Sequence, residues 1–201
     1  MAILYLIRHA ENDYVGKRLA GRLPDIHLNA TGRHQAEVVA ENLRRDPIVA
    51  IYSSPMERAL ETAAPLARDL YLPVNSHPGL IEIDFGAWQG EPISHLKKLK
   101  LWQTVQRKPS DARFPQGESF QEAQERIVSA LETINSAYGQ NDRVVCFSHG
   151  DTIRLAVCHF LNMPLDSFQR LAIHTASITR LHFSHAMVIL MQYNQPVFPI
   201  D

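Results

Sequence analysis

The chain divides into short stretches that are apolar throughout and longer stretches in which apolar positions recur with a helical period. Residues 2–7, 48–54 and 142–150 contain the clearest continuous apolar runs. Runs of this length without polar alternation are typical of strands buried on both faces. We therefore predict strands in these three places, one or two short strands within 72–86, and two final strands at 176–183 and 187–193.

Helical periodicity occupies the segments between the predicted strands. In 31–45, apolar residues recur three and four positions apart, and Pro47 ends the pattern. Ser54 followed by Pro55 is a favourable helix start with Ser54 as the N-cap, so we predict that the next helix begins there. Further helices are predicted over 92–107, over a long stretch that includes Phe120 and stops at Gly139, and from Asp151 to a stop at Pro164.

Strands and helices alternate along the chain, and the strands are unbroken apolar runs. This combination predicts an α/β fold, a three-layer α/β/α sandwich with a mostly parallel central sheet. The last two strands are joined by a short turn, which favours an antiparallel terminal pair. The length of 201 residues suits a single domain over 1–201, and no linker or repeat divides it.

Charge and composition exclude several classes of partner. A formal net charge of −1 offers no strong field for nucleic acid or an anionic membrane, and no apolar run is long enough to span a bilayer. The N-terminal apolar run ends at Arg8, which is too early for a signal-peptide core. Cys146 and Cys158 lie in apolar stretches without metal-like spacing, so we expect buried, free thiols and a cytoplasmic location.

Chemically active side chains follow four of the predicted strands. They are Arg8-His9, Arg58 in the helix after the second strand, Glu82, and His149-Gly150. Each alone has an ordinary structural explanation, but ligands of open α/β sheets bind where the strands end. Arginine is suited to bidentate phosphate binding, and backbone N–H groups at the helix starts after Gly150 and Pro55 would add positive potential. The sequence therefore predicts a phosphate site at this edge of the sheet.

Five short segments occur in a fixed order between residue 4 and about residue 155. They read LIRHAEN, SSPMERALETA, LIEIDFGAWQG, FPQGES and VVCFSHGDTIR. Together they resemble the motifs of the histidine phosphatase superfamily, the phosphoglycerate mutase-like group with an Arg-His-Gly motif, and HTASITRL near the C-terminus is a weaker match. The resemblance implies a phosphoglycerate mutase-like fold and phosphoryl transfer.

The resemblance also implies a role for each active side chain. His9 would be the nucleophile that takes the phosphoryl group, and Arg8, Arg58 and His149 would hold the phosphate oxygens. Glu82 would protonate the leaving oxygen and then activate water. The chemistry is consistent, because nearby arginines keep an imidazole neutral and nucleophilic, and a carboxyl with a raised pKa serves both proton transfers. No metal or other cofactor is expected, since the arginines supply the positive charge.

Several positions depart from the family pattern or extend it. Ala10 replaces the glycine of the Arg-His-Gly motif, and Val15 replaces an asparagine. Asn12 stands where threonine or serine is usual and can still donate a hydrogen bond to phosphate. Gln116 replaces a glycine in the Pro-Gly-Gly-Glu-Ser segment, so the local turn is expected to differ. Arg22 lies in a loop that often lines the family's pocket, which makes it a candidate substrate contact.

The segment 91–115 allows two interpretations. Its stretch HLKKLKLWQTVQRK contains five lysines or arginines, which form either a solvated helix face or a mobile cap that sets substrate choice. Trp88 is expected to pack in the core, and Trp102 either there or at the pocket entrance. Asp84 is the reserve acid if Glu82 points away. The remaining histidines are scattered without zinc-like spacing, and His182 and His185 are expected at the surface.

Three functions remain open at this point. The first is a phosphatase that hydrolyses a small phosphate monoester through phospho-His9. The second is a cofactor-dependent phosphoglycerate mutase, which the short stretch between Glu82 and FPQGES, without an Arg-Arg pair, disfavours. The third is a non-catalytic relative, which the presence of all five core residues disfavours. The sequence names neither the phosphorylated substrate nor the oligomeric state.

Overall fold

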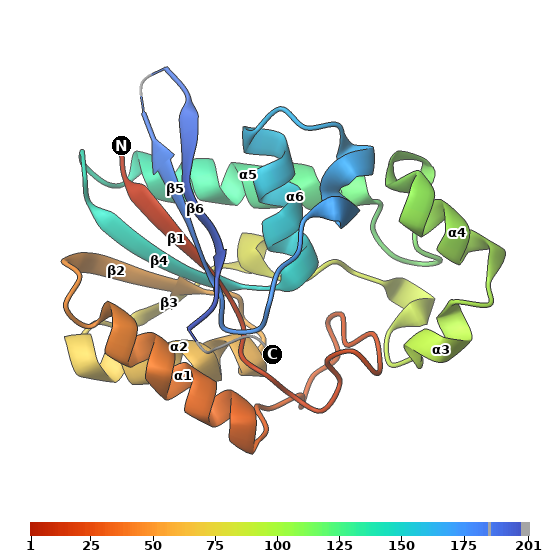
Figure 1. Cartoon of the computed structure of the whole chain (residues 1–201), viewed down its shortest axis with the longest axis horizontal. Helices are drawn as coiled ribbons and strands as arrows, with labels where there is room; N and C mark the ends of the chain where they lie inside the picture. Colours follow the sequence, from red (N-terminus) through yellow and green to blue (C-terminus); the bar gives the residue numbers. More distant parts are fainter. Residues whose placement is uncertain (185, 198–201) are drawn as a thin grey trace.

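The computed structural model of the protein describes residues 1–184 and 186–197 (Figure 1). Six strands form one sheet in the order β3-β2-β4-β1-β5-β6. The four strands from β3 to β1 run parallel, while β5 is antiparallel to β1 and β6 is antiparallel to β5. The predicted mostly parallel sheet with an antiparallel terminal pair is confirmed. The strands are β1 (Ile3–Arg8), β2 (Ile48–Ser53), β3 (Val74–Ser76), β4 (Arg143–Ser148), β5 (Ile178–Phe183) and β6 (Val188–Gln195).

Helices cover both faces of the sheet, which gives the predicted three layers. In Figure 1, α1 and α2 lie together on one side of the strands, and α5 and α6 lie on the other. Two short helices, α3 and α4, extend the α5–α6 side beyond the sheet. The helices are α1 (Ala30–Leu43), α2 (Glu57–Leu70), α3 (Ile93–Leu96), α4 (Lys100–Arg107), α5 (Phe120–Ser136) and α6 (Gly150–Phe160).

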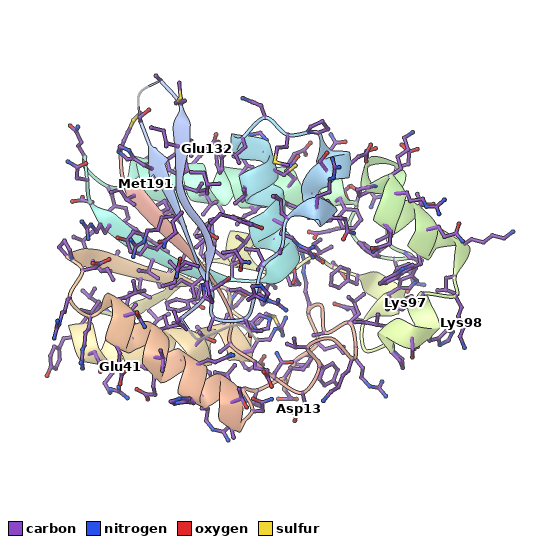
Figure 2. The ribbon with its side chains drawn as sticks, in the orientation of Figure 1. Asp13, Glu41, Lys97, Lys98, Glu132 and Met191 are labelled. Atoms are coloured by element: carbon purple, nitrogen blue, oxygen red, sulfur yellow. The ribbon has the colours of Figure 1, made fainter. Side chains whose placement is uncertain are left out.

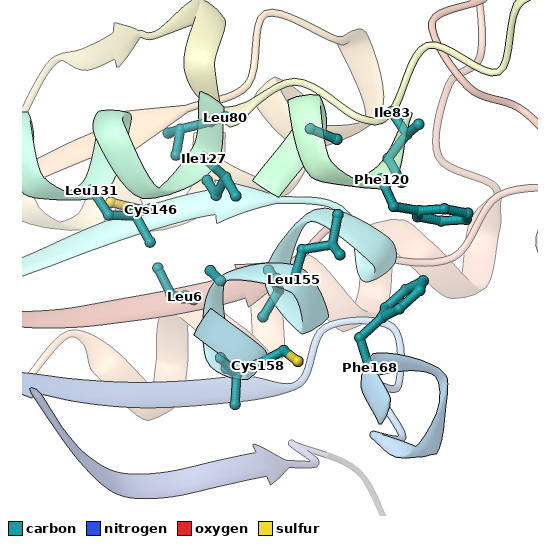
Figure 3. Close-up of a cluster of buried hydrophobic side chains, with 14 of the residues drawn as sticks. Leu6, Leu80, Ile83, Phe120, Ile127, Leu131, Cys146, Leu155, Cys158 and Phe168 are labelled. Carbon is teal, nitrogen blue, oxygen red and sulfur yellow. The ribbon is translucent and has the colours of Figure 1, made fainter. Parts of the chain in front are cut away.

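Alternate residues of the central strands supply two separate hydrophobic cores. In β1, Leu4 and Leu6 face the helices α5 and α6, whereas Tyr5 and Ile7 face α1 and α2. Figure 3 shows the first of these cores, with Leu6 among side chains from α5 and α6. Both faces of the strand are apolar because both are covered, which explains why the sequence shows no polar alternation there. The two cores hold the strand ends in fixed positions.

Helix boundaries differ from the sequence prediction at one place near the site. The helix expected to start at Ser54 and Pro55 begins at Glu57, with Met56 as the N-cap. The backbone N–H of Ser54 instead donates to Phe147 at 2.9 Å, so the chain stays extended beyond β2. The hydroxyl of Ser54 contacts His149 at 2.7 Å. The same hydroxyl accepts the backbone N–H of Met56 at 3.3 Å, so Ser54 serves both a local turn before the helix and a long-range contact.

Two other segments are more broken than predicted. The region 72–86 contains one strand, β3, followed by a single 3₁₀ turn at Pro78–Leu80, because Pro78 cannot donate to a sheet ladder. The predicted helix over 92–107 is interrupted between α3 and α4. Lys97 and Lys98 are exposed there, and Figure 2 places both at the outer edge of the molecule. Their exposure favours a solvated face for these two lysines.

The remaining predictions concern residues outside the described ranges and the possibility of a membrane span. The predicted surface position of His185, and the last four residues of the predicted single domain, lie outside the described residues. Across the described parts of the chain, no helix combines the length and the apolar character needed to cross a membrane.

Candidate active site

A cavity of about 260 Å³ opens where the carboxyl ends of the parallel strands meet the loop 13–29. The ends of β1 and β4 are adjacent because Arg8 pairs with Ser148 in the parallel register. The first turn of α2, the segment after β3 and the start of α6 complete the inner wall. Of the residues predicted for the site, Arg8, His9, Asn12, Arg58, Glu82 and Gly150 line this cavity.

His9 follows β1 and is buried, with 6% of its surface exposed. Its Nδ1 lies 2.8 Å from the carbonyl oxygen of Ala10. Since a carbonyl only accepts, Nδ1 carries the proton and Nε2 keeps a free lone pair. Burial lowers the pKa of His9 well below its usual range, and the charges of Arg58 and Arg8 lower it further. The imidazole is therefore neutral at neutral pH and its Nε2 is available as a nucleophile.

Arg8 and Arg58 present buried guanidinium groups with unused donors. The Nη1 of Arg8 donates to the carbonyl of Ile173 at 2.7 Å, and the Nη2 of Arg58 donates to that of Gly21 at 2.6 Å. Among the described residues, Nε of Arg8 and both Nε and Nη1 of Arg58 are buried without a hydrogen-bond partner. An unpaired buried charged donor is costly, so this arrangement is suited to an anion that accepts these hydrogen bonds.

His149 lies behind the cavity wall. It is fully buried, and its ring centroid is 5.2 Å from that of His9. Its Nδ1 is 3.3 Å from Nη2 of Arg58, which can only donate, so Nε2 carries the proton and donates to the Ser54 hydroxyl at 2.7 Å. Burial and, after it, the charge of Arg58 lower the pKa of His149 well below its usual range. Both nitrogens are occupied in this arrangement and His149 is not among the residues lining the cavity, so its predicted contact with phosphate stays a prediction.

Glu82 lines the cavity and is 9% exposed. Its Oε1 accepts hydrogen bonds from the backbone N–H of Ile83 at 3.0 Å and from the hydroxyl of Thr152 at 2.9 Å. Burial raises the pKa of Glu82, and the nearby charge of Asp151 raises it further. Such a carboxyl holds its proton to a higher pH than an ordinary glutamate, as a general acid requires.

Charged side chains outside the cavity hold the segment that carries Glu82. Arg22 donates from Nε to the carbonyl of Glu82 at 2.9 Å and from Nη2 to Glu118 at 2.7 Å. Arg126 donates to both carboxylate oxygens of Glu118 and to the carbonyl of Ile81. Burial acts to raise the pKa of Glu118, but the hydrogen bonds from Arg126, Asp84 N–H and Arg22 hold it below its usual range.

This network changes the interpretation of two predicted residues. In the described structure, Arg22 is not among the side chains lining the cavity, and its guanidinium supports the Glu82 segment instead. Asp84 also lies outside the lining, and its Oδ1 accepts from Gly86 N–H at 2.9 Å. The guanidinium of Arg22 therefore contacts the Glu82 segment in this structure, and its predicted contact with a substrate stays a prediction. Asp84 is not needed as a reserve, since Glu82 points into the cavity.

Most departures from the family motifs cause little disturbance. Ala10 is fully buried, and its N–H donates to Thr62 at 2.9 Å. Asn12 uses Oδ1 to accept from Tyr14 N–H at 3.0 Å, and Val15 lines the cavity through an apolar side chain. Gln116 has a positive φ of 61°, so the turn keeps a backbone conformation that normally favours glycine. The turn expected to differ at Gln116 therefore remains of the glycine type.

Gly150 is tightly placed at the first turn of α6. A Cβ on this residue would lie 3.2 Å from Nε of Arg8, closer than a side chain normally packs. The absence of a side chain lets the helix start approach the guanidinium. The N–H groups of this turn and Arg8 can then act on the same anion.

The sequence reasoning missed four polar residues of the cavity wall. Tyr14 and Arg18 come from the loop 13–29, which has no periodic pattern to reveal their direction. Asp151 and Arg154 lie in the first turns of α6, three positions apart. Helical spacing from Gly150 would have indicated that they share the cavity side of the helix. Within the part of the chain that the structure describes, no group of three or more histidines, cysteines or acidic residues is placed to hold a metal ion.

The sequence also matches a known protein family. The family described as histidine phosphatase superfamily (branch 1) matches residues 4–196. The chain belongs to this superfamily. The resemblance stated from the motifs is thereby confirmed over nearly the whole chain.

Relatives of this histidine phosphatase carry two kinds of name. It is 31% identical to phosphoserine phosphatase 1 of Hydrogenobacter thermophilus over 96% of this chain and 92% of that protein. It is also 31% identical to a probable phosphoglycerate mutase, GpmB, of Proteus mirabilis, over 92% and 87% of the two chains. Among solved structures, an Entamoeba histolytica phosphoserine phosphatase mutant in complex with phosphoserine superposes with a TM-score of 0.86 at 28% identity, covering 96% and 97%. The predicted class of phosphoric monoester hydrolase is confirmed, and mutase names occur beside it.

Proposed function

We propose that this protein hydrolyses a small phosphate monoester through a phosphohistidine formed on His9. The observation that carries the proposal is the combination at the cavity floor. A neutral imidazole with a free Nε2 lies beside Arg8 and Arg58, and among the described residues the Nε of Arg8 and the Nε and Nη1 of Arg58 are buried without a hydrogen-bond partner. This arrangement supplies a nucleophile and a positive cradle for the phosphoryl oxygens at the same place.

In the first step, Nε2 of His9 attacks phosphorus as the bond from phosphorus to the ester oxygen breaks. The leaving oxygen takes the proton of Glu82 and departs as an alcohol. Arg8, Arg58 and the N–H groups at Gly150 bind the equatorial oxygens, where negative charge accumulates. Asn12 adds an amide donor at the same wall. His149 acts indirectly, by orienting Arg58.

In the second step, water replaces the alcohol. Glu82, now a carboxylate, takes a proton from the water as its oxygen attacks phosphorus, and the bond from phosphorus to Nε2 breaks. Inorganic phosphate leaves, His9 returns neutral, and Glu82 is protonated again. The raised pKa of Glu82 suits both transfers, because the carboxyl keeps its proton to a higher pH than an ordinary glutamate and takes a proton back more readily once it has lost one.

We also make proposals about the size of the substrate, the domain organisation and the cellular location. The cavity volume supports a small substrate, and relatives named for phosphoserine or phosphoglycerate make these compounds the first to test. We propose one catalytic domain, in which 91–115 forms an outer cap over the cavity through Ile93. We also propose a cytoplasmic location, which two free, buried cysteines support.

The test compares wild type with His9→Ala on p-nitrophenyl phosphate in the presence of EDTA. The matched control is His159→Ala, since His159 is exposed on α6. We expect EDTA-resistant hydrolysis in wild type and control, and loss of at least about 10³-fold in His9→Ala. Rapid acid-free quenching with labelled substrate should trap one labelled, acid-labile phosphoryl group per wild-type chain and none in His9→Ala.

Three outcomes would contradict the proposal. Activity abolished by EDTA would point to metal-assisted hydrolysis. Activity retained in His9→Ala would exclude this nucleophile. Interconversion of 2- and 3-phosphoglycerate faster than phosphate release would identify a mutase instead.

A further inference from the structure

An oppositely charged pair, Asp151 and Arg154, lies on the wall of the catalytic cavity. Both residues belong to the first two turns of α6, and the Nη2 of Arg154 forms an ion pair with Oδ1 of Asp151. Their side chains keep 21% and 23% of their surface exposed, so neither is sealed in the core. They line the same cavity as His9 and Glu82.

The guanidinium of Arg154 is fixed in position, but not all of its N–H groups have a hydrogen-bond partner among the described residues. Its guanidinium lies 5.5 Å from the ring centroid of Phe168, which fixes one side of the group. Its Nε is buried and has no hydrogen-bond partner in the described part of the chain. A carboxylate approaching from the cavity would satisfy this donor and take a second hydrogen bond from Nη2. Arg154 therefore offers a planar anion site separate from the two arginines at His9.

In the mechanism proposed above, Asp151 contacts neither the phosphoryl group nor the leaving oxygen. A carboxylate at the wall of a phosphate-binding cavity repels the substrate's dianion. Its charge also adds to the raised pKa of Glu82. A fixed carboxylate beside a cavity binds a cationic group well. Because the substrate enters this cavity, the cationic group is expected on the substrate.

We propose that Asp151 and Arg154 select substrates in which an ammonium and a carboxylate accompany the phosphate ester, that is, O-phosphoamino acids. The proposal rests on the proposed phosphatase function and assigns its substrate class. The substrate's ammonium contacts Asp151, and its carboxylate contacts Nε and Nη2 of Arg154. One internal ion pair is exchanged for two with the ligand, so no buried charge is left alone.

Three esters with related skeletons separate the two contacts. O-Phosphoserine carries both groups, 3-phosphoglycerate has a hydroxyl in place of the ammonium, and O-phosphoethanolamine lacks the carboxylate. We expect wild-type kcat/KM to be roughly tenfold or more higher for phosphoserine than for either of the others, since a site built for a charged group discriminates against its absence.

Two variants then assign the contacts. In Asp151→Asn, the preference of phosphoserine over 3-phosphoglycerate should fall to about twofold or less, a loss of roughly fivefold or more. In Arg154→Gln, phosphoserine and 3-phosphoglycerate should both lose roughly tenfold or more while phosphoethanolamine changes little. Glu132→Gln is the control, because Glu132 is exposed on α5 and is not among the residues that line the cavity.

Ratios between substrates make the test specific. Asp151→Asn also acts on the pKa of Glu82, but that acid serves every ester, so its effect cancels in the ratio measured at one pH. Equal loss on all three esters in both variants would show a structural role and overturn the proposal. A wild type that prefers 3-phosphoglycerate would overturn it as well.

Failure of this inference can be told apart from failure of the proposed function. Labelling of His9 and hydrolysis of p-nitrophenyl phosphate, which carries neither group, report on the phosphatase chemistry alone. If both persist while the substrate ratios do not respond, only the substrate class is wrong. If neither is present in wild type, the proposed function itself fails.

Discussion

The two ends of the catalytic cavity are built in different ways. The inner end consists of residues at or beside strand ends, such as His9, Arg58 and Glu82, each less than a tenth exposed and fixed by hydrogen bonds. The outer end consists mainly of the loop 13–29, and the segment 91–115 contributes Ile93 to it. The inner end is held between two cores, whereas the outer end rests on one of them.

Aromatic packing, rather than the sheet, supports the outer end. Trp102 of α4 stacks on Trp88 with ring centroids 6.1 Å apart, and Trp88 packs on Phe114 at 5.4 Å. Trp88 is buried, as predicted, and Trp102 is partly buried against the same core. We infer from this difference that the fold fixes the reacting groups at the inner end and leaves the shape of the entrance to the outer end. Substitutions at the inner end should therefore act on kcat, and those at the outer end on KM.

Among the substitutions that test this difference between the two ends, Glu82→Gln should lower kcat the most. The variant keeps the shape of the side chain but has no proton to give, so kcat for an alkyl monoester should fall about 10²–10⁴-fold. The loss should be smaller for p-nitrophenyl phosphate, whose leaving group is stable as an anion. Steady-state kinetics on both esters measure it, with Asp84→Asn as the control two positions away. Equal losses on both esters would remove Glu82 from proton transfer.

Arg58→Met should have the second largest effect. We expect kcat/KM to fall about 10²–10³-fold, because the transition state loses the guanidinium that donates hydrogen bonds to the phosphoryl oxygens. The control is Arg68→Met on the same helix, since the side chain of Arg68 is 61% exposed and pairs with Glu37. Labelling of His9 should slow in parallel with turnover. A response of Arg58→Met no larger than that of Arg68→Met would place the phosphate elsewhere.

The pH dependence of stability tests the burial of the inner end. Burial lowers the pKa of both His9 and His149, so below about pH 6.5 the unfolded chain binds protons that the folded chain does not. The free energy of unfolding should therefore fall as pH falls from about 6.5, by up to about 1.4 kcal/mol per pH unit for each histidine. Urea unfolding of wild type and His9→Asn at several pH values isolates one contribution. Identical slopes would mean that His9 is not held neutral.

Trp102→Ala should produce the smallest effect and act at the outer end. We expect kcat to change less than about twofold and KM to rise less than tenfold, because Trp102 packs on Trp88 beside the cavity and is not among the residues that line it. Lys98→Ala, at an exposed position after α3, should leave both constants within about twofold of wild type. A large loss of kcat in Trp102→Ala would show that the two ends are coupled.

The inner end could be predicted from the sequence because each residue follows an apolar run. Parallel strands place their carboxyl ends together, so Arg8-His9, Arg58 and Glu82 were expected to converge once the sheet was predicted to be mostly parallel. The motifs then supplied their expected roles. Gly150 lines the cavity for the same reason, because it closely follows the end of β4, whereas Asn12 was expected from the motif that follows His9.

The remainder depended on contacts between distant parts of the chain. His149 was expected to hold phosphate, but its ring meets Ser54 and Arg58, which lie over 90 positions away. Arg22 was expected at the substrate, but Glu118 attracts its guanidinium across 96 positions. Neither partner leaves a local signal in composition or period. Arg18 lies in an aperiodic loop, where no pattern indicates which side chains face inward.

The network around Glu118 also limits how this protein can change over generations. Glu118 receives Arg22 and Arg126, two cations from different parts of the chain, and its carboxylate also accepts the N–H of Asp84. A neutral residue at 118 would leave two guanidinium groups without their shared counter-charge and loosen the segment that carries the acid. These three positions should therefore be inherited as a set, and a descendant that loses one is expected to have replaced the others.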